Sequence, residues 1–462
     1  MDQTDRFINL SLSEDALIAK GEHILAAYVM EPATDHEFLS VATQLAIESG
    51  RGTQGALTTD LDLSTALDVF AYEANTASGL VKLAFPVALF DINMSDGTPT
   101  ISSFLNLLVG NTQGMAEVAA LKLHDFHLPH GYLSKFSGPQ TTIASLWRLL
   151  GQDETAGGLI VGAILKPKLG LRPTGLAGAA YQFWLEGDLV KNDQPQGNQS
   201  FAPLAATLPL LADAMKRAQD KTGAAKLFSM NLTCDDPSEM EQRGEMALRA
   251  FGENAAHLAF HVDAYIAGPM AFTHARRCFG AHFLSAHRAG HAAITSPRAN
   301  RGYSAFVLTK IARLLGASGI HTGTMGFGRM EGLEADRPIA CMIAQDSATG
   351  PHFAQSWHGL PRSAAMVSGG INALRLPSFL HNLGHSNFVL AAGGGAFGHI
   401  DGPTAGALSL RQAEACWLAR ADPIEFAVDH PEFARAFYSF ENDADIIHPG
   451  WRRALRPETT NQ

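Results

Sequence analysis

The segment GLIVGAILKPK, residues 158–168, is a run of apolar residues that ends abruptly on two lysines. A second segment, GDLVKND at residues 187–193, has the same design, because apolar residues lead into an amine, an amide and a carboxylate. Short apolar runs of this kind are typical of strands that are buried on both faces, as in parallel sheets. Polar and charged side chains at the ends of such strands indicate a functional site there.

Six further runs follow the same design along the chain. They are AKLFSMNLT (225–233), HLAFHVDA (257–264), FLSAHRAG (283–290), GIHTGTM (319–325), AAMVSGG (364–370) and FVLAAGGG (388–395). Helical patterns lie between several of the runs, for example at residues 209–223 and 305–319. Regular alternation of strand and helix predicts parallel βα units, and eight such units predict a closed (β/α)8 TIM barrel of the α/β class.

The chain of 462 residues is long enough for two or three domains. Residues 1–136 mix strand-like and amphipathic helical segments, which predicts an N-terminal α+β domain. We expect the barrel at residues 137–405. Residues 406–462 are helical in pattern, and we expect a C-terminal extension packed on the barrel.

Composition excludes several classes of protein. A formal net charge of −11 leaves no basic stripe for nucleic acid. No uncharged apolar stretch reaches the ~20 residues of a membrane span, and the N-terminal residues lack a signal-peptide pattern. We therefore expect a cytoplasmic protein. Its four cysteines form no CxxC pair, so we expect buried free thiols rather than disulfides or a cysteine metal site.

The predicted strands end on residues that are suited to chemistry. In a TIM barrel these ends meet at one mouth. The residues concerned are Lys166, Lys168, Lys191, Asp193, His287, Arg288, His321, Ser368 and the glycines 369–370 and 393–395. Glycine turns offer backbone N–H groups to a phosphate, and Arg288 and His321 offer cationic donors to a second anion. A bisphosphate that spans the mouth is the simplest ligand.

The lysines suggest two further features. Lys166 and Lys168 repel each other, so one amine can be neutral near pH 7 and act as a base or nucleophile. Lys191 stands beside Asp193, where an ammonium would repel a divalent cation. If Lys191 reacts with CO2 to form an anionic carbamate, Lys191 and Asp193 together would present two oxygen ligands to a hard cation such as Mg²⁺.

Longer motifs resemble ribulose-1,5-bisphosphate carboxylase/oxygenase (RuBisCO) of the form II, large-subunit-only type. The resemblance extends over nearly the whole chain. The motifs that carry it are GLIVGAILKPKLGLRP, KNDQPQGNQ, HRAGHAAITSP, GASGIHTGTMGFGRMEG, SGGINALRLP and AAGGGAFGHIDGP.

The resemblance implies a role for each matching residue. Lys166 is the base that forms the enediolate, with Lys168 beside it. Lys191 carries the activating carbamate, and Asp193 binds Mg²⁺. The other implied residues are His287 for later proton transfers, Arg288 and His321 for one phosphate, Ser368 for a substrate hydroxyl, and Gly370, Gly393 and Gly394 for the other phosphate. The N-terminal domain of a neighbouring subunit is implied to add Glu48, Thr53 and Asn111, which requires a homodimer and allows higher oligomers.

Three positions depart from the family pattern. Gln194 replaces the carboxylate of the KxDE metal motif, which weakens Mg²⁺ binding. Arg329 replaces the lysine of a mobile loop that stabilises the new carboxylate, and a forked guanidinium is a poor substitute for a point charge. Gln54 replaces an asparagine. Enolisation needs Lys166 and the metal, whereas carboxylation and oxygenation also need the loop, so enolisation is the better supported half of the reaction.

Other functions stay open at this level. A RuBisCO-like protein could use the same base to isomerise or decarboxylate another sugar phosphate. A Schiff-base aldolase could use Lys166 or Lys191 as its amine. A non-catalytic subunit could bind sugar phosphates without reacting them.

Overall fold

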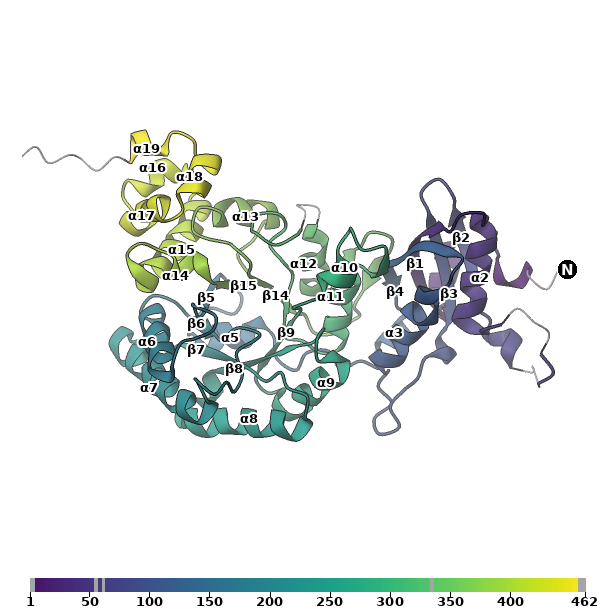
Figure 1. The fold of residues 1–462 in the computed structure, drawn as a ribbon, viewed down its shortest axis with the longest axis horizontal. Helices are drawn as coiled ribbons and strands as arrows, with labels where there is room; N and C mark the ends of the chain where they lie inside the picture. The colour runs from purple at the N-terminus through teal and green to yellow at the C-terminus, as the bar shows by residue number, and fades with distance from the viewer. Residues whose placement is uncertain (1–4, 54–56, 60–62, 333–335, 456–462) are drawn as a thin grey trace, which may run out of the picture. The chain divides into compact units, whose positions relative to one another are not determined.

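A computed structural model describes residues 5–53, 57–59, 63–332 and 336–455 (Figure 1). The chain divides into two compact units. The first unit comprises residues 1–138, 289–316 and 341–362, and the second comprises 139–288, 317–340 and 363–462. The first unit is thus the predicted N-terminal domain with two later segments added. The boundaries at 136/137 and 405/406 stay predictions.

The first unit is built on a five-stranded sheet of order β10-β4-β1-β3-β2. Its strands are β1 (His23–Pro32), β2 (Phe70–Asn75), β3 (Leu80–Pro86), β4 (Val118–His127) and β10 (Arg301–Tyr303), and β10 alone runs parallel to its neighbour. Its helices in the N-terminal part are α1 (Glu14–Lys20), α2 (Phe38–Gly50), α3 (Ile101–Val109) and α4 (His130–Leu133). Helix α2 packs on the sheet through its buried apolar face. The α+β expectation is confirmed.

The second unit contains a closed barrel of eight parallel strands in the order β11-β14-β15-β5-β6-β7-β8-β9. The strands are β5 (Ile160–Ile164), β6 (Leu189–Lys191), β7 (Leu227–Asn231), β8 (Leu258–Asp263), β9 (Phe283–His287), β11 (Gly319–His321), β14 (Ala364–Val367) and β15 (Val389–Ala392). Each of the eight apolar runs contains one of these strands. The predicted TIM barrel is confirmed.

Helices alternate with these strands along the chain and ring the barrel (Figure 1). They are α5 (Ile143–Leu149), α6 (Pro173–Trp184), α7 (Leu204–Thr222), α8 (Pro237–Phe251), α9 (Gly268–Phe279), α13 (Leu376–Leu383) and α14 (Gly394–Phe397). Helices α10 (Ala292–Thr295) and α11 (Ala305–Leu314) belong to the first unit, and α12 (Arg337–Ala344) begins in the second unit and ends in the first. A short hairpin, β12 (Ser347–Thr349) with β13 (Ala354–Ser356), belongs to the first unit.

The C-terminal part of the chain is helical, as expected. Its helices are α15 (Gly402–Leu418), α16 (Pro423–Ala427), α17 (Pro431–Ser439), α18 (Glu441–Ile447) and α19 (Trp451–Ala454). Helix α15 packs on α6 and on β5, so it forms part of the barrel wall. In the described part of the chain, no helix has both the length and the apolarity for a membrane crossing.

An apolar layer fills one end of the barrel and leaves the other end to polar residues. Its members come from the starts of the strands, for example Ile160, Leu189, Leu227 and Phe283, and Trp147 of α5 packs against them. Because this plug occupies the N-terminal end, polar side chains gather at the C-terminal mouth, where barrel enzymes place their chemistry.

The expectation of four buried thiols is wrong for most of the cysteines. All four are free, but only Cys416 is buried, whereas Cys234 and Cys341 are half-buried and Cys278 is exposed. Helix α9 turns Phe272, Ala275 and Phe279 inward, so its Cys278 lies on the outer face.

Close packing at Gly162 gives a testable prediction about the barrel. A Cβ on Gly162 of β5 would lie 2.5 Å from the Leu390 carbonyl oxygen of β15. We expect Gly162→Ala to lower the free energy of unfolding by about 1–3 kcal/mol through overpacking. Gly178→Ala on α6 is the control, because a Cβ there meets nothing within 4 Å and alanine favours a helix. Denaturant unfolding would contradict this explanation if both variants behaved alike.

Candidate active site

Lys191 lies at the end of β6 with its side chain fully buried. Its Nζ lies 3.1 Å from the Asn192 carbonyl oxygen and 3.0 Å from His261 Nε2. Burial lowers the pKa of Lys191 to about 7, against the opposing effect of Asp193 and Asp263. An amine with this pKa is partly neutral at neutral pH and can act as a nucleophile.

His261 of β8 contacts the Lys191 amine, and it was not among the site residues predicted from the sequence. Burial holds the pKa of His261 well below its usual value, so the ring is neutral. Its Nδ1 lies 3.2 Å from Ser229 Oγ on β7, and a neutral ring can accept a hydrogen bond from Lys191 at Nε2. The period-two spacing of His261 and Asp263 in the run HLAFHVDA was the available signal.

Asp193 binds Lys166 across the ends of two adjacent strands. Lys166 Nζ donates to Asp193 Oδ2 at 2.8 Å, while the Gln194 backbone N–H donates to Oδ1 at 2.9 Å. Burial acts to raise the pKa of Asp193, but the contacts with Lys166 and Lys191 lower it overall. The carboxylate is therefore ionised at neutral pH and available to a cation.

The turn after β6 is held by side-chain amides. Asn231 of β7 donates through Nδ2 to the Gln194 carbonyl oxygen at 2.8 Å, and its backbone N–H donates to Asn192 Oδ1 at 2.8 Å. Gln196 accepts from the Asp193 backbone N–H through Oε1 at 2.6 Å. These bonds hold the backbone at residues 192–196 and tie the turn to β7.

A row of polar groups crosses the mouth from β8 to the turn after β14. His287 Nδ1 lies 3.3 Å from Asp263 Oδ2, and the His287 and His321 rings meet edge to face with centroids 4.5 Å apart. His321 Nδ1 lies 3.1 Å from Ser368 Oγ. Burial lowers the pKa of both histidines. The structure thus brings together three residues that the sequence placed on separate strands.

Several buried polar atoms near these histidines have no hydrogen-bond partner. They are Arg288 Nη1, His321 Nε2, Thr322 Oγ1 and Thr324 Oγ1. Burial lowers the pKa of Arg288 to about 10, which still leaves the guanidinium charged at neutral pH. A buried cation and buried hydroxyls without partners are costly, and an anion such as a phosphate would satisfy them together.

Two glycine turns closely approach catalytic candidates. A Cβ on Gly393 would lie 2.7 Å from Lys166 Cε. Gly370 has φ +100°, and a Cβ there would lie 2.7 Å from Arg329 Cγ. Arg329 is itself exposed, and its backbone N–H donates to the Gly369 carbonyl oxygen at 2.7 Å. At Gly394, the start of α14, a Cβ would meet nothing within 4 Å.

Four predicted site residues remain, one in the second unit and three in the first. Lys168 is exposed, whereas Lys166 is half-buried. The remaining three belong to the first unit: Glu48 on α2, Thr53 after it, and Asn111 at the start of a 3-10 helix. Gln54 lies outside the described residues.

Together the fold and the mouth define a TIM-barrel enzyme that handles a phosphorylated substrate with an ionised carboxylate and a buried amine. Two family models match the chain: "Ribulose bisphosphate carboxylase large chain, catalytic domain" at residues 142–440, and the corresponding N-terminal domain at residues 11–132. The chain belongs to the RuBisCO large-chain family, as the form II resemblance predicted.

Curated relatives agree with this assignment. The chain is 56% identical over 459 residues to a ribulose bisphosphate carboxylase of Rhodopseudomonas palustris, covering 99% of this chain and 100% of the relative. It is 54% identical over 456 residues to the enzyme of Cereibacter sphaeroides, covering 99% of each. These matches support ribulose bisphosphate carboxylase/oxygenase function and favour it over an aldolase or a non-catalytic subunit.

Solved structures agree in fold. The dimeric archaeal RuBisCO of Hyperthermus butylicus matches with a TM-score of 0.83 at 28% identity, over 94% of this chain and 98% of that one. The octameric RuBisCO of Pyrococcus horikoshii matches with a TM-score of 0.82 at 26% identity, over 95% and 97%.

RuBisCO enzymes depend on Mg²⁺ and on a carbamate formed by CO2 on a lysine, and this chain shares these cofactors as a family member. The residues at the mouth fit them. Lys191 presents a buried amine of lowered pKa for CO2, and Asp193 presents an ionised oxygen ligand of the kind that Mg²⁺ prefers.

The pKa of Lys191 predicts how carbamate formation depends on pH. CO2 reacts with the neutral amine, so in metal-free protein at fixed dissolved CO2 the initial rate should fall about tenfold per pH unit below the pKa of about 7 and level off above it. Carbon-13 NMR with labelled CO2 would follow the carbamate signal. The signal should vanish in Lys191→Met and persist in Lys216→Met, which changes an exposed lysine of α7. A midpoint near 10 would contradict the buried environment.

Proposed function

We propose that Lys166 removes the C3 proton of ribulose 1,5-bisphosphate and that Lys191 carries the activating carbamate. The observation that supports this most strongly is the convergence of Lys166, Asp193 and Lys191 at the ends of β5 and β6. Asp193, Gln194 and the carbamate would hold Mg²⁺. Bound there, the cation would stabilise the negative charge that develops on the substrate.

The phosphate groups would bind at opposite sides of the mouth. Arg288 and His321 would hold one phosphate, which is supported by their unpartnered buried nitrogens. Gly370, Gly393 and Gly394 would offer backbone N–H groups to the other, and Lys168 would lie beside the substrate. Ser368 would bind a substrate hydroxyl.

His287 would serve in the later proton transfers. Asp263 faces its Nδ1, which favours the tautomer with the proton on that nitrogen. Burial lowers the pKa of His287, so the ring is neutral before it accepts a proton. Asp263 would then stabilise the imidazolium that forms, as a positioning residue.

A second copy of the chain would complete each site. We propose a homodimer in which Glu48, Thr53 and Asn111 of one subunit reach the barrel of the other. The structural neighbours include one dimeric and one octameric RuBisCO. A higher oligomer built from such dimers is compatible with the proposal, and the cytoplasmic location stays a prediction.

Arg329 would limit the addition of CO2 rather than enolisation. Lys166 and Asp193 are in place without any contribution from the segment at 323–332, so proton removal at C3 does not need it. Stabilising the new carboxylate requires a well-placed positive charge, and a guanidinium is longer and forked where an ammonium is compact. The enzyme would therefore form more enediolate than it carboxylates.

This limit predicts a gap between two rates. We expect exchange of the C3 proton with solvent to exceed CO2 fixation by about a hundredfold, which a displacement near 1 Å can produce. Arg329→Lys together with Gln194→Glu should close most of that gap. Exchange of labelled hydrogen and incorporation of labelled bicarbonate would be measured on the same CO2- and Mg²⁺-activated protein.

Arg217→Lys, an exposed change on α7, is the matched control and should alter neither rate. If the unmodified protein fixes CO2 about as fast as it exchanges the C3 proton, the site tolerates arginine and the proposed limit is wrong. Exchange followed by isomerised or decarboxylated sugar phosphate would favour the RuBisCO-like alternative.

Gln194 gives a separate prediction about the metal. Gln194→Glu should tighten Mg²⁺ binding by roughly tenfold or more, because a carboxylate adds a full charge beside a divalent cation. A Mg²⁺ titration of carbamate stability would give the midpoint. Gln242→Glu, an exposed change on α8, is the control. An unchanged midpoint for Gln194→Glu would mean that this side chain does not face the cation.

A further inference from the structure

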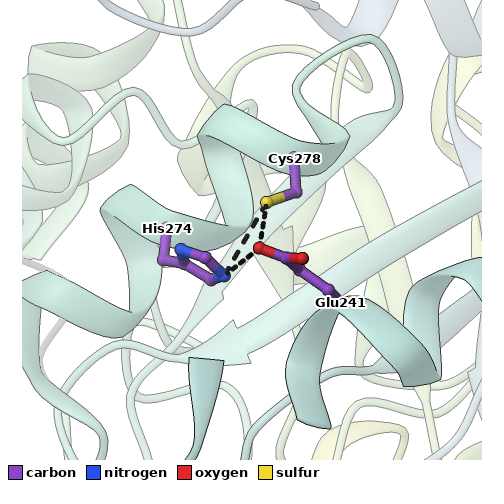
Figure 2. Close-up of side chains that lie close together, drawn as sticks. All are labelled: Glu241, His274 and Cys278. Atoms are coloured by element: carbon purple, nitrogen blue, oxygen red, sulfur yellow. Dashed lines mark hydrogen bonds and ion pairs between the residues drawn. The ribbon is translucent and has the colours of Figure 1, made fainter. Parts of the chain in front are cut away.

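Three potential metal ligands meet on the outer wall of the barrel, outside the active site. They are Glu241 of α8 and His274 and Cys278 of α9, and Figure 2 shows their side chains converging on one point. Glu241 Oε1 lies 3.1 Å from His274 Nε2 and 3.6 Å from Cys278 Sγ, and His274 Nε2 lies 3.7 Å from Cys278 Sγ.

Helix packing holds this trio in place. His274 and Cys278 are four residues apart on α9 and therefore share one face. On α8, Gly244 leaves room for the Phe279 ring, since a Cβ there would lie 2.1 Å from Phe279 Cζ. This close contact between the two helices lies about one helical turn from Glu241 on α8 and next to Cys278 on α9.

The separations match the edges of a tetrahedral zinc site. Zinc bonds of about 2.0 Å to oxygen, 2.1 Å to nitrogen and 2.3 Å to sulfur imply tetrahedral edges of about 3.3 Å for N–O, 3.6 Å for N–S and 3.5 Å for S–O. The corresponding separations here are 3.1, 3.7 and 3.6 Å. We propose that Glu241, His274 and Cys278 bind one Zn²⁺ per chain, with water as the fourth ligand.

The chemistry of the trio favours zinc over the Mg²⁺ of the active site. Thiolate and imidazole are poor ligands for Mg²⁺ and good ligands for Zn²⁺. Without metal, burial and the neighbouring carboxylates of Glu241 and Glu245 raise the pKa of Cys278, which keeps the thiol protonated. Binding of Zn²⁺ would release that proton to solvent and form the Zn–S bond.

His274 must also exchange a hydrogen bond for the metal. Its Nε2 faces both Glu241 Oε1 and the Pro237 carbonyl oxygen, the latter at 3.2 Å, so in the metal-free protein Nε2 carries the hydrogen. A shift to the Nδ1 tautomer would free the Nε2 lone pair for Zn²⁺. The bound ion would tie α8 to α9 and stabilise this part of the barrel wall without touching substrate.

Metal analysis of the intact, oligomeric enzyme tests the proposal. Protein dialysed against Zn²⁺ with excess Mg²⁺, which keeps the active site occupied, should retain one zinc per chain by atomic emission. Cys278→Ser and His274→Gln should lose that zinc, while Cys234→Ser, which changes a half-buried cysteine elsewhere, should keep it. None of these changes should alter CO2 fixation.

Two further readouts make the result decisive. Co²⁺ in place of Zn²⁺ should give a thiolate charge-transfer absorption that is absent in Cys278→Ser. In the unmodified protein, Zn²⁺ should protect the exposed Cys278 from a thiol reagent, as measured by the mass of the modified peptide. This measurement needs no variant, so it tests the site even if a substitution prevents folding. Zinc retained by Cys278→Ser, or no protection of Cys278, would overturn the site and leave the proposed catalytic function untouched.

Discussion

The burial of the Lys191 amine is the constraint around which the active site is arranged. A charged ammonium with no water around it is costly, and here burial lowers the pKa to about 7. Asp193 and Asp263 offset only part of that cost, and Asp193 is also paired with Lys166. His261 is kept neutral by the same burial and faces the amine through Nε2. Conversion of the amine into an anionic carbamate would bring negative charge to a mouth that already holds the Arg288 guanidinium.

The apolar plug at the opposite end of the barrel makes that burial possible. Leu189 begins β6 in the plug and Lys191 ends it at the mouth, so one short strand runs from apolar packing to the catalytic amine. Gly162 and Gly319 allow neighbouring groups to approach the barrel strands closely. A Cβ on Gly162 would lie 2.5 Å from the Leu390 carbonyl oxygen, and a Cβ on Gly319 would lie 2.7 Å from the Phe283 ring. Tight packing below the mouth buries the Lys191 side chain from that end of the barrel.

The sequence predicted the eight strands because parallel barrel strands are continuous apolar runs, and it predicted strand-end residues such as Lys191 and His287 because these interrupt the runs. It missed His261 and Ser229 because both lie inside a run, where the pattern does not separate the barrel interior from the exterior. The trio on α8 and α9 was missed for another reason. Glu241 meets His274 only through the packing of Gly244 against Phe279, a contact that no local pattern encodes.

The segment around Arg329 is positioned by its backbone, which determines what a change of side chain can do. Arg329 donates its backbone N–H to Gly369, and Arg375 donates to the Phe327 carbonyl oxygen at 2.9 Å. Arg375 also forms an ion pair with Asp443 of α18. This pair lowers the pKa of the Asp443 carboxyl, and Arg329 adds a smaller effect in the same direction. The charge of Arg329 thus contributes to the field at Asp443, while its Cγ is confined beside Gly370. A lysine at this position would have the same backbone placement but a shorter side chain. Asp443 would then be paired with Arg375 alone, and the lysine charge would be free to interact with the substrate.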